Sequence, residues 1–137
     1  MSDFFRFPHT PHIAWLGPGM PRDDKVLAPP EVEALLADEV VVEEKVDGAN
    51  LGISLAPDGR LRGQNRGQYL TEPYRGQFSR LGAWLAQHRF VLSEHLTPQL
   101  ILFGEWCAAR HSLDYQALPD WFLLFDVYDR EAGKFWS

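Results

Sequence analysis

The residues best suited to chemistry surround Lys45, in residues 43–50 (Glu-Glu-Lys-Val-Asp-Gly-Ala-Asn). The chain has only three lysines, and this one lies beside three carboxylates, between two segments that have the pattern of strands. A neutral lysine amine held near a phosphate can attack phosphorus and form a phosphoramide. Neighbouring carboxylates favour the charged ammonium, so activation requires a divalent cation in the same pocket. The alternative interpretation is a hairpin turn with solvated charges.

Three further segments carry polar residues in positions that suit ligand binding. Glu105 closes the apolar strand that begins at Leu100, where a carboxylate suits a ribose or a metal-bound water. Phe125 and Asp126 interrupt another apolar strand, and an aromatic ring there suits base stacking. Arg66 follows a strand and precedes a glycine, and its planar fork suits a phosphate. The structural alternatives are a solvent-facing acid, a core phenylalanine and a surface arginine.

Cys107 is the single cysteine, which excludes an intrachain disulfide and a four-cysteine zinc site. Its neighbour in sequence, His111, makes a Cys–His nucleophilic pair conceivable, although adjacency in sequence rarely gives that geometry. The spacing of nearby ligand types fits no zinc pattern. We expect a cytosolic, reducing environment, so the predicted location is cytoplasmic.

Length and composition indicate one globular domain, or part of one, and argue against a protein that simply coats duplex nucleic acid. The 137 residues are 45% hydrophobic, and the net charge of −6 argues against non-specific duplex binding. The charge is uneven, because residues 56–92 carry six arginines against two acidic residues. An enzyme that holds phosphates at one local site can have this distribution, and chance clustering of surface charge is the alternative. No apolar run reaches the length of a membrane span.

The elements that must position these residues are predicted from periodicity and turn signals. Residues 39–44 and 50–56 are predicted strands around Lys45, and the turn at residues 57–59 leads to a returning strand at 60–64. Pro30 begins a short helix to Leu36. Apolar residues at intervals of three and four predict a helix over 76–95. Residues 100–106 and 121–128 are the remaining predicted strands.

The predicted fold class is α+β with a largely antiparallel sheet, because helices and strands do not alternate regularly. We predict a single domain over residues 1–137, with an irregular N-terminal arm over residues 1–30 that is rich in proline, glycine and aromatic residues. No internal repeat or low-complexity linker divides the chain.

Four segments, taken together and in order, resemble motifs of the covalent nucleotidyltransferase superfamily of ATP-dependent ligases and mRNA-capping enzymes. The resemblance is strongest to the nick-sealing (RNA ligase 2-like) branch of the RNA ligase family, which favours an asparagine five residues after the lysine. The segments that resemble motifs I, Ia, III and IIIa are Glu44-Lys45-Val46-Asp47-Gly48-Ala49-Asn50, Gln64-Asn65-Arg66-Gly67, Leu102-Phe103-Gly104-Glu105-Trp106 and residues 122–128. This resemblance implies an ATP-grasp-like nucleotidyltransferase domain.

The resemblance also implies a three-step reaction with ATP and Mg²⁺ or Mn²⁺. Lys45 attacks the α-phosphate of ATP, AMP passes from the lysine to a 5′-phosphate, and a 3′-hydroxyl then seals the RNA strand break or RNA/DNA strand break. By the same resemblance, Arg66 contacts phosphate, Glu105 contacts the ribose or a metal-bound water, and Asp47 contacts the water shell of the metal.

The remaining implied roles concern the adenine and the support of the site. Phe125 stacks on adenine, Glu44 reads the adenine edge, and Val46 belongs to the nucleotide site. Asn50 and Asp126 support the other residues.

One departure from the family pattern changes what we expect of this chain. The family has two later motifs, a Glu-Gly motif and a Lys-x-Lys motif, and after Tyr128 the sequence supplies neither. We therefore expect a domain truncated at its C-terminus, or half of a split enzyme whose second chain supplies these motifs. Three alternatives remain: a GTP-dependent capping-type guanylyltransferase, a DNA ligase, and a non-catalytic fragment that binds nucleotide or RNA.

Overall fold

The structure, a computed structural model, describes residues 3–19, 25–109 and 119–137. The chain divides into two compact units, Met1–Arg6 with Val46–Ser137, and Phe7–Lys45. The elements in chain order are α1 (Pro29–Leu36), β1 (Ala49–Leu55), β2 (Leu61–Gln64), the 3₁₀ turn Gly76–Phe78, α2 (Leu81–His95), β3 (Leu100–Trp106), β4 (Phe122–Asp129) and β5 (Lys134–Phe135). Within the described part of the chain, no helix is long and apolar enough to cross a membrane.

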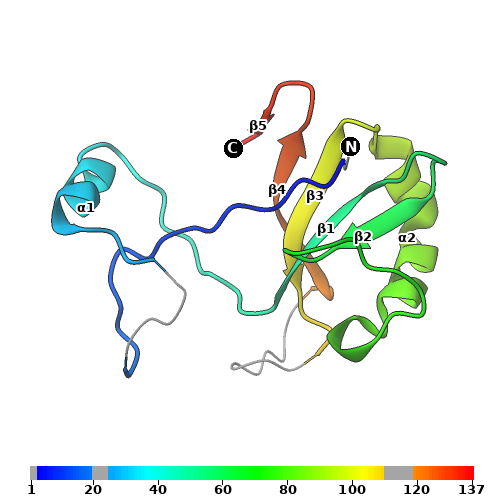
Figure 1. Cartoon of the computed structure of the whole chain (residues 1–137), viewed down its shortest axis with the longest axis horizontal. Coiled ribbons are helices and arrows are strands. Elements are labelled where there is room, and N and C mark those ends of the chain that lie inside the picture. Colours follow the sequence, from blue (N-terminus) through cyan, green and yellow to red (C-terminus); the bar gives the residue numbers. More distant parts are fainter. Residues whose placement is uncertain (1–2, 20–24, 110–118) are drawn as a thin grey trace. The chain divides into compact units, whose positions relative to one another are not determined.

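The first unit is built on one sheet of five strands in the order β2-β1-β3-β4-β5, and every pair of neighbours is antiparallel (Figure 1). Together with its helices, this sheet confirms the predicted α+β class. The β1–β2 hairpin is also confirmed, because Gly59 adopts a φ of 84° in the turn and the Asp58 carboxylate accepts the Arg60 backbone N–H at 3.0 Å. The predicted helix over 76–95 is present with a 3₁₀ turn before its main segment.

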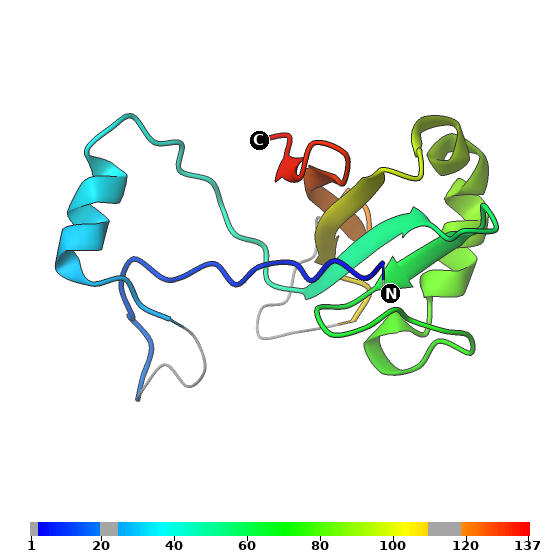
Figure 2. The same cartoon turned by 45° about the horizontal axis from the view of Figure 1, so that its top comes forward.

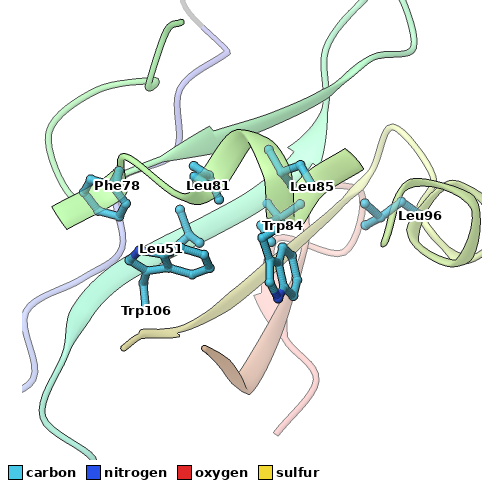
Figure 3. Close-up of a cluster of buried hydrophobic side chains, with 8 residues drawn as sticks. Leu51, Phe78, Leu81, Trp84, Leu85, Leu96 and Trp106 are labelled. Atoms are coloured by element: carbon cyan, nitrogen blue, oxygen red, sulfur yellow. The ribbon is translucent and has the colours of Figure 1, made fainter. Parts of the chain in front are cut away.

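Helix α2 covers one face of this sheet, and the buried core lies between them (Figures 2 and 3). Side chains along a strand point alternately to its two faces, so Leu51 and Ile53 of β1 point to the same face of the sheet. Both pack there against residues of α2. The indole of Trp106 is fully buried, and its N–H donates to the carbonyl oxygen of Gln77 at 2.8 Å. The buried residues of this cluster are Leu51, Ile53, Phe78, Leu81, Trp84, Leu85, Leu96 and Trp106.

The opposite face of the sheet carries a second apolar group, which centres on Phe103. Phe103 is fully buried, although it does not face α2, because it lies opposite Gly52 in the β1–β3 register. The N-terminal segment Asp3–Arg6 belongs to this unit and brings Phe5 against Phe103 and Tyr128. Both faces of the central strands are therefore covered over part of their length.

The second unit contains α1 and two short irregular segments that pair locally. The predicted helix is present and begins at Pro29, one residue before the predicted Pro30, and the Glu31 carboxylate accepts the Ala28 backbone N–H at 2.9 Å. His12 pairs with Val26 in an isolated parallel bridge. The backbone of residues 39–44, by contrast, forms no strand, so that prediction is wrong. Val41 and Val42 are 82% and 91% exposed, because β-branched residues favour extended backbone but cannot supply the partner that a sheet requires.

The position of Leu51 in the core gives a stability prediction for the sheet unit. Leu51→Ala removes a fully buried side chain and leaves a cavity, so we expect it to lower the free energy of unfolding by about 2–5 kcal/mol. Leu124→Ala is the matched control, because Leu124 is 53% exposed. Urea denaturation of both variants measures the difference, and equal losses would contradict the assignment of the core.

Candidate functional site

The pairing of β1 with β3 brings Asn50 and Glu105 together. Asn50 lies directly opposite Glu105 in the antiparallel register, and Ala49 lies opposite Trp106. Both polar residues occupy the sheet face that α2 does not cover, because their neighbours Leu51 and Trp106 point into the core. Two residues that the sequence predicted for one site are therefore neighbours in the structure.

Gly48 allows the segment before β1 to approach the end of β3 closely. A Cβ atom at this position would lie 2.7 Å from the Trp106 carbonyl oxygen and 2.9 Å from the Cys107 sulfur. The same atom would lie 3.3 Å from a carboxylate oxygen of Glu105. The glycine therefore allows close approach of the protein's own strand, and its φ is not positive.

Two carboxylates, those of Asp47 and Glu105, influence the pKa of the Cys107 thiol. Burial raises the pKa of Cys107, and the negative charges of Glu105 and Asp47 raise it further. The charges of both carboxylates thus act on the same thiol. In the described ranges, however, no three His, Cys, Asp or Glu side chains form a group that could hold a metal ion directly. His111, the suggested partner of Cys107, lies outside the described residues.

A tight turn after β2 carries Arg66. The Asn65 side-chain oxygen accepts the backbone N–H groups of Gly67 at 2.8 Å and Gln68 at 2.9 Å, and the Asn65 N–H donates to the Gln68 carbonyl oxygen. This is an Asx-type turn, in which a side chain substitutes for backbone hydrogen bonding. The turn fixes the backbone of Arg66 immediately beyond the end of β2.

A cavity of about 500 Å³ joins Arg66 to Asn50. Asn50 lines it, and both the nitrogen and the oxygen of the Asn50 side-chain amide are buried without a hydrogen-bond partner among the described residues. A buried amide without partners is costly, and a group that supplied both a donor and an acceptor would satisfy it. Gln68, Gln77 and Phe78 also line the cavity, and they were not predicted because nothing in their local sequence pattern marks them as site residues.

Strand β4 carries Phe125 and Asp126 at an irregularity in its pairing. Phe103 lies opposite Asp126 and Gly104 opposite Leu124, so Phe125 is the extra residue of a β-bulge. Phe125 is 43% exposed, so the alternative that it is a core residue is wrong. The Asp126 carboxylate accepts the Val127 N–H at 2.8 Å and the Ser137 hydroxyl at 2.6 Å. These contacts fix its orientation on the same face as Glu105.

Glu44 and Lys45 are the last two residues of the second unit, and Val46 is the first residue after them in the sheet unit. Their backbone belongs to no helix or strand, and β1 begins at Ala49. The structure therefore groups Asp47, Asn50, Arg66 and Glu105 around the start of β1. It places Phe125 and Asp126 on β4, two strands away from β1.

A comparison with protein-family models finds a match to the RNA ligase family over residues 38–137. The chain belongs to the RNA ligase family. The match includes Lys45, the cavity and all five strands of the sheet. The curated proteins and the solved structures that were compared contain no match to the chain.

The close approach at Gly48 predicts that a methyl group there is not tolerated. We expect Gly48→Ala to lower the free energy of unfolding by roughly 1–3 kcal/mol, because the new atom would meet backbone that cannot move freely. Gly82→Ala is the control, since its Cβ would meet only the Tyr74 ring at 3.4 Å. Thermal or urea unfolding measures both, and an unchanged midpoint for Gly48→Ala would contradict the approach described above.

The Cys107 environment predicts a pH effect that does not depend on activity. The pKa of Cys107 is raised in the folded chain, so the native state holds this proton to higher pH than the unfolded state does. Above the pKa of the unfolded thiol, stability must therefore fall as pH rises. We expect the pH profile of Cys107 alkylation to lie higher in the native chain than in urea, and Asp47→Asn to move the native profile down. Asp58→Asn is the control, and an unmoved profile for Asp47→Asn would contradict the proximity.

Proposed function

We propose that this RNA ligase family member is an ATP-dependent RNA ligase that uses Lys45 as its nucleophile. The Lys45 nitrogen attacks the α-phosphorus of ATP, a P–N bond forms, and the bond to pyrophosphate breaks. AMP then passes to a 5′-phosphate, and attack by a 3′-hydroxyl joins the strand and releases AMP. The observation that carries this proposal is the cavity that Asn50 and Arg66 both line, together with the unpartnered side-chain amide buried at Asn50.

The cavity residues suit the polar parts of a nucleotide. Arg66 offers a guanidinium, which binds phosphate oxygens through paired N–H groups. Asn50 offers a donor and an acceptor, and Glu105 beside it offers an acceptor for ribose hydroxyls. The exposed ring of Phe125 suits adenine stacking, and Asp126 supports the strand that carries it.

The two carboxylates near Cys107 fit a divalent cation that keeps most of its water. Mg²⁺ is commonly bound by one or two carboxylates together with substrate phosphates, and it rarely needs a complete protein cage. Asp47 and Glu105 are the residues that would hold its water shell, and the cation would neutralise charge on the phosphates. The chain's own contribution is to present these carboxylates at the end of β3 beside Asn50.

The labelling experiment for Lys45 compares the full chain with Lys45→Ala and Lys45→Arg. Each is incubated with α-labelled ATP and Mg²⁺ or Mn²⁺ and resolved on a denaturing gel. We expect weak, acid-labile label on the wild type alone, because no Lys-x-Lys motif is present in these 137 residues. Arginine retains the charge of lysine but is not a nucleophile at neutral pH, so Lys45→Arg controls for electrostatics.

The outcomes of this experiment separate the competing functions. Label on Lys45→Ala would overturn the assignment of the nucleophile, and competition by GTP but not ATP would favour a guanylyltransferase. Absence of label on the wild type would contradict catalysis by this chain. In that case, ATP binding that weakens about tenfold or more in Asn50→Ala and Arg66→Ala would support the non-catalytic nucleotide-binding alternative.

A further inference from the structure

The N-terminal segment Asp3–Arg6 lies on the sheet face that α2 leaves open, and its Phe5 ring stacks on one aromatic ring and contacts two others. The Phe5 ring lies parallel to the Tyr128 ring, with centroids 3.7 Å apart and an interplanar angle of 7°. The ring centroids of Phe103 and Phe135 each lie 6.1 Å from the centroid of the Phe5 ring. In both views the blue start of the chain runs along the sheet (Figures 1 and 2). Phe5 thus occupies an aromatic cup formed by β3, β4 and β5.

Asp3, at the start of this segment, is held by two arginines and a tyrosine. Arg62 forms an ion pair with the Asp3 carboxylate, and the Tyr69 hydroxyl donates to it at 3.0 Å. Arg130 donates to the Asp3 backbone carbonyl oxygen and lies within 3.5 Å of the Tyr69 hydroxyl. Arg62 also lies over the Tyr69 ring, at 3.9 Å from its centroid. The hydrogen bond from Arg62 is the main reason that the pKa of Asp3 is lowered.

This arrangement has the chemistry of a nucleotide site. Two guanidinium groups and a phenol hydroxyl are donors that suit a phosphate, and Asp3 supplies only one carboxylate against the two cations. A flat ring parallel to Tyr128 is the geometry that a stacked base adopts. The buried side-chain amide of Gln64 donates to the Phe5 carbonyl oxygen at 2.7 Å. The same amide N–H could donate to an oxygen of a base or a sugar.

We propose that residues 3–6 occupy, in cis, a binding site for one nucleotide of a single-stranded RNA. The Asp3 carboxylate takes the place of a phosphate, and the Phe5 ring takes the place of a base. A bound RNA strand displaces the segment, with its phosphate between Arg62 and Arg130 and its base on Tyr128. This site lies apart from the cavity at Asn50, and its occupation does not require AMP transfer by Lys45.

The first test measures binding of a fluorescein-labelled oligoadenylate to the full chain by anisotropy. If the segment occupies the site about 90% of the time, its removal raises the apparent affinity about tenfold. We therefore expect Asp3→Ala/Phe5→Ala to bind the oligonucleotide about tenfold more tightly than the wild type. The matched control is Asp58→Ala/Phe90→Ala, which removes the same residue types from exposed positions and is expected to bind as the wild type does. Equal or weaker binding by the Asp3/Phe5 variant, with a native melting curve, would overturn the proposal.

Adding Arg62→Gln and Arg130→Gln to the Asp3/Phe5 variant tests the phosphate contacts. We expect these changes to abolish the gain in affinity and to reduce the dependence of binding on salt, because two phosphate contacts are lost. If the variant with all four substitutions kept both the higher oligonucleotide affinity and the salt dependence of the Asp3/Phe5 variant, the RNA would bind at a different site and the proposal would be overturned.

A second measurement covers the case in which the Asp3/Phe5 variant does not fold. Ultraviolet crosslinking of a 4-thiouridine oligonucleotide to the unmodified chain, followed by peptide mapping, needs no substitution. Crosslinks to the peptides that contain Tyr128 or Phe135 support the proposal, and crosslinks confined to other segments overturn it. A synthetic peptide with the sequence of residues 2–7 is expected to reduce these crosslinks, whereas a scrambled peptide is not.

Discussion

The antiparallel pairing of β1 with β3 is the constraint on which the rest of the sheet unit depends. Leu51 and Trp106 must point toward α2 to bury their side chains, so the alternating pleat sends Asn50 and Glu105 to the other face. A slip of one residue would place the Asn50 amide under the helix and expose Leu51 to water. Burial of apolar groups on one face therefore fixes the position of the polar groups on the other.

The polar groups on that face contribute little to stability in the folded chain. An unpartnered buried amide such as that of Asn50 costs about 1–3 kcal/mol, which a leucine or valine at the same position of the strand would avoid. Gln64 is similar, because its side chain is fully buried and only its nitrogen has a partner in the described structure. Polar groups that are retained at such a cost are explained more readily by ligand binding than by packing.

The sequence was sufficient where a local pattern decides the structure and insufficient where a distant contact decides it. The hairpin at Gly59 and the helix through Leu85 follow from turn chemistry and periodicity, and both were predicted. The strand over residues 39–44 failed because extended backbone needs a partner that no local pattern reveals. The bulge at Phe125 and the approach of Gly48 to Trp106 also depend on register between strands far apart in sequence. Residue types thus led to candidate site residues, whose roles stay predictions, but they did not show how the fold holds these side chains.

Lys45 lies just before the part of the chain that the sheet holds in place. Sheet hydrogen bonds fix Asn50 and Glu105, but the ladder begins at Ala49, so the backbone of Lys45 lies outside it. Positioning a nucleophile against its target can supply about 7–11 kcal/mol toward the reaction barrier. In the proposed reaction the ladder does not supply this positioning for Lys45, so contacts with the nucleotide itself would have to complete it. Arg66 and Asn50 would hold the phosphates and sugar, and the neutral amine of Lys45 would attack the α-phosphorus. Nucleotide binding and positioning of the proposed nucleophile would then depend on the four residues between Lys45 and Asn50.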